Sequence, residues 1–198
     1  MKYRQLGKYG IKLSEIGLGT WLTFGHGIEH NTAKKCVSAA LDNGINFYDT
    51  ADVYAIGAAE KTLGKILFGE LKIRRDDIVL ATKCFHPMSR NPNNQGLSRK
   101  HISESVNNSL KRLKTNYIDI MQCHRFDVYT PLEETCRTFN DLIIQGKILY
   151  WGVSEWTAEQ IEEAVLTCEK YNLHKPVSNQ PQYNIIHPYI ETNGIIAV

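Results

Sequence analysis

The chain has 198 residues, of which 42% are hydrophobic and 22% are charged, and its formal net charge is +2. These values are ordinary for a globular domain, so we expect one compact domain spanning residues 1–198, and the absence of a basic block argues against a nucleic-acid partner. No apolar run approaches the roughly 20 residues that cross a bilayer, and the first residues lack the core of a secretory signal, so we expect no membrane insertion and a cytoplasmic location.

Short runs of β-branched and aliphatic residues recur along the chain and predict buried strands. Ahead of them, residues 2–13 carry Gly7 and Gly10 between apolar residues, which favours an N-terminal β-hairpin. The six clear strand candidates are residues 15–19, 45–49, 78–83, 117–124, 148–154 and 177–180, and residues 195–198 are a seventh candidate.

Amphipathic segments separate the strand candidates, because apolar residues repeat there at helical spacing. The shared faces are Ala33, Val37, Ala40 and Leu41; Ile102, Val106, Leu110 and Leu113; and Ile161, Val165 and Cys168. Thr130 with Glu133, and Thr157 with Gln160, fit the capping box that starts a helix. Alternating strands and helices imply parallel strands with right-handed crossovers, arranged either as an open doubly wound sheet or as a closed barrel.

Five strand candidates end on a polar residue, which is the most informative pattern in the sequence. These residues are Asp49, Lys83, His124, Ser154 and Gln180. The carboxyl ends of the strands in a parallel barrel lie on one face, where barrel enzymes place their active sites. Helix capping explains any one such residue, but a carboxylate, an amine and an imidazole together are costly to bury unless they are paired. The pattern therefore predicts a functional site at this face.

Two other site types are not supported by the sequence. The cysteines are odd in number, widely spaced and without a C-x-x-C pair, which predicts reduced thiols and neither a disulfide framework nor a metal site. Gly17 and Gly19 are followed by Leu22 where a dinucleotide-binding fingerprint has its third glycine, so they do not form a Rossmann loop.

The sequence resembles the aldo-keto reductase family, in the branch that includes potassium-channel β-subunit-like reductases. The resemblance covers nearly the whole chain and implies a (β/α)8 TIM-barrel fold. It rests on six motifs in the order of the family: GLGTW at 17–21, FYDTADVY at 47–54, ATK at 81–83, CHRFD at 123–127, GVSEW at 152–156 and NQPQYN at 179–184.

The resemblance implies a catalytic tetrad and a role for each of its members. Tyr54 would protonate the carbonyl oxygen as general acid, and Lys83 would lower its pKa from the usual value of about 10. Asp49 would hold Lys83 in place, and His124 would orient and polarise the carbonyl group.

The same resemblance implies NADPH as the cofactor and a small aldehyde or ketone as the substrate. Trp21 is weighed evenly between a pocket wall and the core, and Glu155 stands where the family usually has Asn or Arg. The residues expected to bind the cofactor are Thr20, Trp21, Asp49, Ser154 and Gln180.

The length of the chain departs from the family pattern, because a (β/α)8 barrel usually needs about 250 residues. We therefore expect an incomplete barrel of six to seven strands that lacks its C-terminal part, including the family's phosphate-binding segments. The expected function is reduction of aldehydes or ketones to alcohols by hydride transfer from NADPH. Two alternatives stay open: a nucleotide-binding regulatory protein like the potassium-channel β subunits, with an oligomer or channel-type partner, and a truncated remnant without activity. His124 favours catalysis, since channel-associated relatives tend to carry Asn there.

Overall fold

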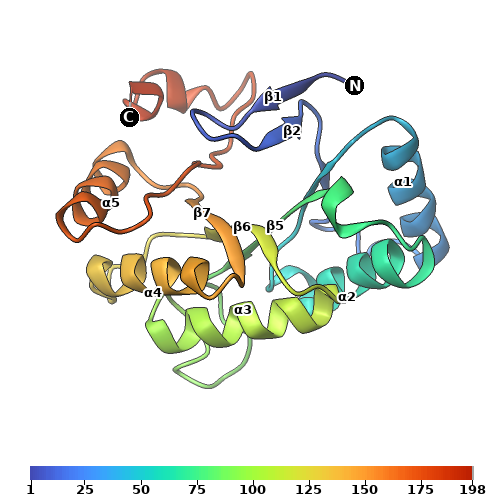
Figure 1. Ribbon diagram of the computed structural model, residues 1–198, viewed down its shortest axis with the longest axis horizontal. Helices are drawn as coiled ribbons and strands as arrows, with labels where there is room; N and C mark the ends of the chain where they lie inside the picture. Colours follow the sequence, from blue (N-terminus) through green and yellow to red (C-terminus); the bar gives the residue numbers. More distant parts are fainter. Residues whose placement is uncertain (198) are drawn as a thin grey trace.

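The computed structural model describes residues 1–197 and is organised around a five-stranded parallel sheet (Figure 1). Its strands are β3 (Leu18–Gly19), β4 (Phe47–Asp49), β5 (Val79–Cys84), β6 (Ile118–Cys123) and β7 (Ile148–Val153). Each strand pairs in parallel with the next strand along the chain. A doubly wound sheet reverses its strand order at a switch point, whereas this order runs in one direction, as in a (β/α) barrel.

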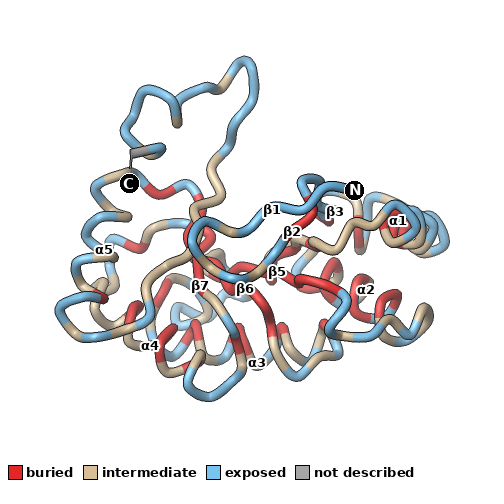
Figure 2. The backbone as a smooth tube through the Cα atoms, turned by 45° about the horizontal axis from the view of Figure 1, so that its top comes forward, coloured by how far each residue is buried: buried red, intermediate tan, exposed pale blue. Residues whose placement is uncertain are grey.

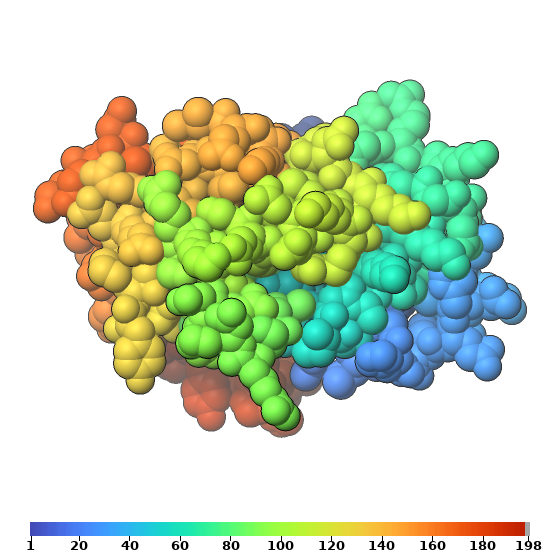
Figure 3. Space-filling model, turned by 90° about the horizontal axis from the view of Figure 1, so that it is seen from below, coloured from blue at the N-terminus to red at the C-terminus, as the bar shows by residue number. Residues whose placement is uncertain are grey.

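Within residues 1–197, five α-helices follow or connect these strands. They are α1 (His30–Asp42), α2 (Ala58–Gly64), α3 (Arg99–Leu113), α4 (Leu132–Ile144) and α5 (Ala158–Lys170). Successive helices from α2 to α5 pack against one another, and Figure 3 shows α2, α3 and α4 side by side. The predicted apolar faces are turned inward, since Val37, Val106 and Cys168 are fully buried. The sequence analysis did not identify α2, which continues into a π-helical turn at Lys65–Glu70.

The N-terminal hairpin covers the other face of the sheet, as the sequence predicted. It consists of β1 (Tyr3–Gln5) and β2 (Lys12–Ser14), which pair antiparallel. Leu13 from the hairpin joins Val79, Ala81 and Ile120 from the sheet in a small apolar cluster. The sheet therefore has two cores, a large one under the helices and a small one under the hairpin.

Of the last two predicted strands, the first is only partly correct and the second is wrong. Residues 177–180 form no full strand, although an isolated parallel bridge joins Val153 to Asn179 and main-chain hydrogen bonds join Val177, Ser178 and Gln180 to β7. The segment at 195–198 is not a strand, because Ile195–Ala197 form a 3-10 helix, and Val198 lies outside the described residues. The backbone of Gly194 is left-handed (φ 80°) and the side chain of Asn193 accepts a hydrogen bond from the Ile195 N–H, so the chain turns here.

One of the two predicted capping boxes is present. The Thr157 hydroxyl accepts the N–H of Gln160, and the Gln160 side chain accepts the N–H of Thr157. The prediction for Thr130 is wrong, because Pro131 occupies the cap position of α4 and the Thr130 hydroxyl donates to Asp127 at 2.7 Å.

The segment beyond Gln180 leaves the body of the protein and is mostly exposed, as Figure 2 shows. It contains short 3-10 turns at Tyr189–Glu191 and Ile195–Ala197. Within residues 1–197, no helix combines the length and the apolar character that crossing a membrane requires.

Candidate active site

The ends of β4 and β5 form a buried ion pair on the inner face of the sheet. The Lys83 ammonium donates to Asp49 Oδ2 at 2.6 Å and to the main-chain carbonyl of Thr50 at 2.9 Å. Lys83 is only 1% exposed. Burial lowers the pKa of Lys83, and the Asp49 carboxylate partly offsets that effect. The expected pairing of these two residues is therefore present.

Tyr54 and His124 lie beside this pair. The Lys83 Nζ atom is 5.2 Å from the centre of the Tyr54 ring, and the centres of the Tyr54 and His124 rings are 5.7 Å apart. Tyr54 begins a 3-10 turn, Tyr54–Gly57, in which Ala55 (φ 50°) and Ile56 (φ 49°) are left-handed. Non-glycine residues adopt this conformation at a cost and often do so near functional sites.

The acidity of Tyr54 differs from the expectation. Burial of the phenol and the nearby Asp49 carboxylate raise the pKa of Tyr54 to about 12, and the Arg125 charge only partly opposes them. The expectation of a pKa below the usual value is wrong, because burial is the largest cause and raises it. Tyr54 is thus protonated at neutral pH.

His124 is a neutral imidazole at neutral pH. Burial, followed by the charge of Lys83, the neighbouring His86 and the charge of Arg125, lowers the pKa of His124 to about 3. Its Nδ1 atom is buried and has no hydrogen-bond partner among residues 1–197. A neutral imidazole offers one N–H donor and one acceptor, so His124 can donate a hydrogen bond to a carbonyl oxygen.

Ser154 and Gln180 join the same group of side chains. The Gln180 amide donates to Asp49 Oδ1 at 3.3 Å, and the Ser154 hydroxyl donates to the main-chain carbonyl of Gln180 at 2.9 Å. All five polar residues at the predicted strand ends therefore come together, as expected from parallel strands.

These residues surround a cavity of about 780 Å³. Its lining contains every predicted site residue except Thr20 and Asp49. Trp21 is 65% exposed and forms part of the wall, so it is not a core residue. Thr20 is fully buried, and its hydroxyl donates to the Thr50 hydroxyl at 2.8 Å. A cavity of this size suits a small organic ligand or part of a cofactor.

Three basic side chains of the lining, His26, His86 and Arg125, were not identified from the sequence. The His86 ring centre is 4.7 Å from that of His124. His86 follows Lys83 by three positions and Arg125 follows His124 directly. The positions of His86 and Arg125, in the loops that follow β5 and β6, are the sequence signal that could have identified them as site residues.

Known proteins resemble this chain over most of its length. The model of the Aldo/keto reductase family matches residues 15–198. A protein of Arabidopsis thaliana named probable voltage-gated potassium channel subunit beta is 46% identical over 185 residues, which are 93% of this chain and 56% of the relative. A protein of Oryza sativa subsp. japonica with the same name is 44% identical over equal shares. The chain thus spans about half the length of these relatives. Because the family model matches almost the whole chain, the chain belongs to the aldo/keto reductase family.

Proposed function

We propose that this chain reduces aldehydes or ketones to alcohols with hydride from NADPH. The observation that carries the proposal is the convergence of Tyr54, Lys83 and His124 on one cavity at the carboxyl ends of the strands. Membership of the aldo/keto reductase family supports the oxidoreductase class.

The polar groups of the cavity fit the nicotinamide end of the cofactor. A carboxamide has one donor and one acceptor group, and Ser154 and Gln180 line the cavity with a hydroxyl and an amide. The side-chain carbonyl of Gln180 makes no hydrogen bond within residues 1–197, and the Ser154 oxygen can still accept one. These two residues would hold the nicotinamide, which supplies the hydride when bound, and Trp21 would border it. Family membership is the support for NADPH over NADH.

Tyr54 provides the proton in this proposal. Negative charge develops on the carbonyl oxygen as hydride reaches the carbonyl carbon, and the Tyr54 O–H gives its proton to that oxygen. With a pKa of about 12, Tyr54 holds its proton until the oxygen becomes more basic than a phenolate. The Lys83 ammonium then stabilises the phenolate that is left, and Asp49 keeps Lys83 in position. His124 donates a hydrogen bond to the same carbonyl oxygen and orients it.

The test compares Tyr54→Phe with the wild type. We expect carbonyl reduction to fall by about 10²-fold or more, because the proton donor is lost while the ring remains. NADPH binding, measured by fluorescence titration with NADH as competitor, should change less than about twofold, a difference below about 0.5 kcal/mol. Tyr129→Phe is the matched control, since Tyr129 is 94% exposed. Equal turnover in Tyr54→Phe and wild type would overturn the assignment, and a folded wild type that binds no nucleotide would favour the inactive remnant.

We propose as a second function that the chain also binds a channel-type partner or forms an oligomer in the cytoplasm. The names of the two relatives support the partner, and the free state of all five cysteines supports the location. Size-exclusion chromatography of the chain with the cytoplasmic domain of a voltage-gated potassium channel tests this proposal. A shared peak is expected, and separate peaks at micromolar concentration would contradict it.

A further inference from the structure

The cavity wall carries one cation that makes no ion pair with the residues described, Arg125. Arg125 and Lys83 are its cationic residues, and Glu155 is its one carboxylate among the described residues. Lys83 is already paired with Asp49. The Glu155 carboxylate accepts the main-chain N–H of Gln182 at 2.6 Å. Within residues 1–197, Arg125 makes no ion pair, and its Nη1 atom donates to the main-chain carbonyl of His124 at 2.5 Å. Its guanidinium therefore has donors left for an anion.

This charge acts directly on the groups that would handle the carbonyl. Burial is the largest cause of the pKa shifts of Tyr54 and His124; the Arg125 charge opposes the shift of Tyr54 and adds to the shift of His124. Arg125 follows His124 immediately, so the guanidinium and the imidazole belong to the same strand end. An anion bound by Arg125 would lie beside the reacting carbonyl.

The neighbouring side chains would also accept an anion. Burial and the Arg125 charge lower the pKa of His86, so it is a neutral imidazole with an N–H to donate. His26 is another imidazole of the wall. A guanidinium binds a carboxylate through two parallel N–H donors, which gives both strength and orientation.

We propose that the substrate is a short aldehyde or ketone that carries a carboxylate, and that Arg125 binds this carboxylate and so determines specificity. The inference rests on the proposed reductase function. A cofactor phosphate offers the same anionic chemistry. We assign the substrate because Arg125 lies next to His124, whereas the phosphates of the cofactor are separated from its reacting ring by a ribose.

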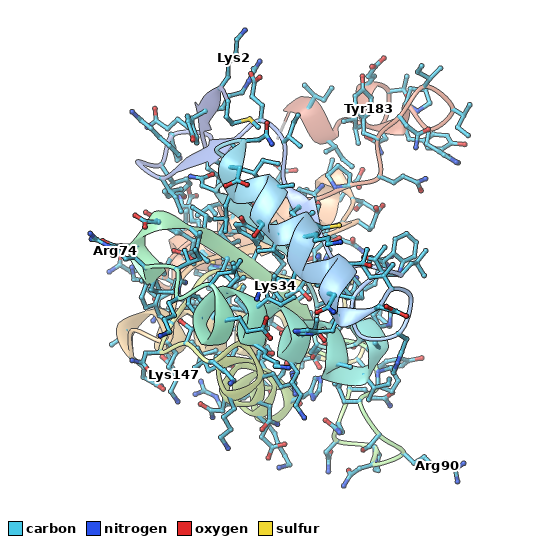
Figure 4. All side chains as sticks on the ribbon, turned by 90° about the vertical axis from the view of Figure 1, so that its right-hand side faces the viewer. Lys2, Lys34, Arg74, Arg90, Lys147 and Tyr183 are labelled. Atoms are coloured by element: carbon cyan, nitrogen blue, oxygen red, sulfur yellow. The ribbon has the colours of Figure 1, made fainter. Side chains whose placement is uncertain are left out.

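The experiment compares two aldehydes that differ in charge, 4-oxobutanoate and its methyl ester, with the full chain saturated with NADPH. We expect the wild type to prefer 4-oxobutanoate in kcat/KM by about tenfold, the effect of one charge-assisted contact. Arg125→Gln should lose this preference, because its kcat/KM falls more on 4-oxobutanoate than on the ester. Arg125→Lys should retain part of it. Arg90→Gln is the control, because Arg90 is exposed and lies at the tip of a loop away from the body of the protein (Figure 4).

The other outcomes separate the remaining explanations. An unchanged preference in Arg125→Gln overturns the inference, and so does a rise in the Kd of NADPH without a change of preference, which assigns Arg125 to a cofactor phosphate. If the wild type reduces no aldehyde, the reductase proposal fails, and calorimetry with 4-hydroxybutanoate and 4-hydroxybutanamide tests the anion site alone. Tighter binding of the carboxylate, lost in Arg125→Gln, supports the site, and equal binding of the two compounds overturns it. Circular dichroism verifies that each variant is folded.

Discussion

Two buried ion pairs lie on opposite faces of the sheet, and each involves one of two neighbouring residues of β5. On the helix side, the Thr82 hydroxyl donates to Glu60 Oε1 at 2.6 Å, and Arg112 donates to Glu60 Oε2 at 2.5 Å. On the inner side, Lys83 donates to Asp49. Successive side chains of a strand point to opposite faces. Thr82 therefore faces the helices, and Lys83, the next residue, faces the cavity.

The two pairs differ in what surrounds them. Glu60 is fully buried, and its two oxygens are both satisfied by protein donors. The inner pair borders a cavity, where His124 Nδ1 is buried without a partner among residues 1–197. A satisfied buried network holds a fold together, whereas unpaired polar atoms beside a cavity are free to bind a ligand. We therefore expect the outer pair to govern stability and the inner pair to govern chemistry.

Arg112→Met gives the largest expected effect, because it leaves the Glu60 carboxylate buried without its cation. Breaking a buried pair in this way should lower the free energy of unfolding by about 3–5 kcal/mol, measured by urea denaturation. Arg74→Met is the control, since Arg74 pairs with Asp76 at an exposed site and should cost less than about 1 kcal/mol. If both variants lose equal stability, the outer pair has no special structural role.

Lys83→Met makes the corresponding change on the inner side. Carbonyl reduction should fall by about 10²–10³-fold, because the phenolate of Tyr54 loses its stabilising charge. The loss of stability should be smaller than in Arg112→Met, since Asp49 remains 16% exposed and keeps its bond to Gln180. Thr82→Val is the control at the neighbouring residue, and it should lower the free energy of unfolding by about 1–2 kcal/mol without affecting turnover. Turnover that survives in Lys83→Met, or falls equally in Thr82→Val, would contradict the division between the two faces.

The two pairs also differ in how far the sequence could predict them. Asp49 and Lys83 end apolar runs, so parallel topology alone predicted that they meet. Glu60 and Arg112 are 52 positions apart within helices, where charged residues usually face solvent. Nothing in their local pattern indicates a buried pair, and α2 itself was not predicted.

Other differences between prediction and structure have local causes. The apolar faces of α1, α3 and α5 were predictable because helical periodicity repeats over several turns. The raised pKa of Tyr54 was not, since it depends on burial by residues distant in sequence. The Thr130 cap failed because Asp127 competes for the same hydroxyl. Arg125 was missed because a charged residue after a strand end usually faces solvent.

Asp52, one of the buried polar groups on the helix side, makes the stability of the fold depend on pH. Its Oδ2 accepts the Ser105 hydroxyl at 2.7 Å, and its Oδ1 is buried without a partner among residues 1–197. Burial raises the pKa of Asp52 to about 7; Glu60 adds to this effect, and the Ser105 hydrogen bond and the Arg112 charge oppose it.

The sign of the pH effect follows from proton binding. Between about pH 4 and pH 7 the folded chain keeps a proton on Asp52 that the unfolded chain has lost, so this residue costs stability as the pH rises. Asp52→Asn cannot lose a proton. Its free energy of unfolding relative to wild type should therefore rise by about 2–4 kcal/mol from pH 4 to pH 8, measured by urea denaturation across that range. Asp76→Asn should show the opposite trend, because Arg74 lowers the pKa of Asp76 in the folded chain. A difference between Asp52→Asn and wild type that stays constant with pH would mean that Asp52 is ionised in the folded protein, and the helix side would then hold an unpaired charge like the cavity side.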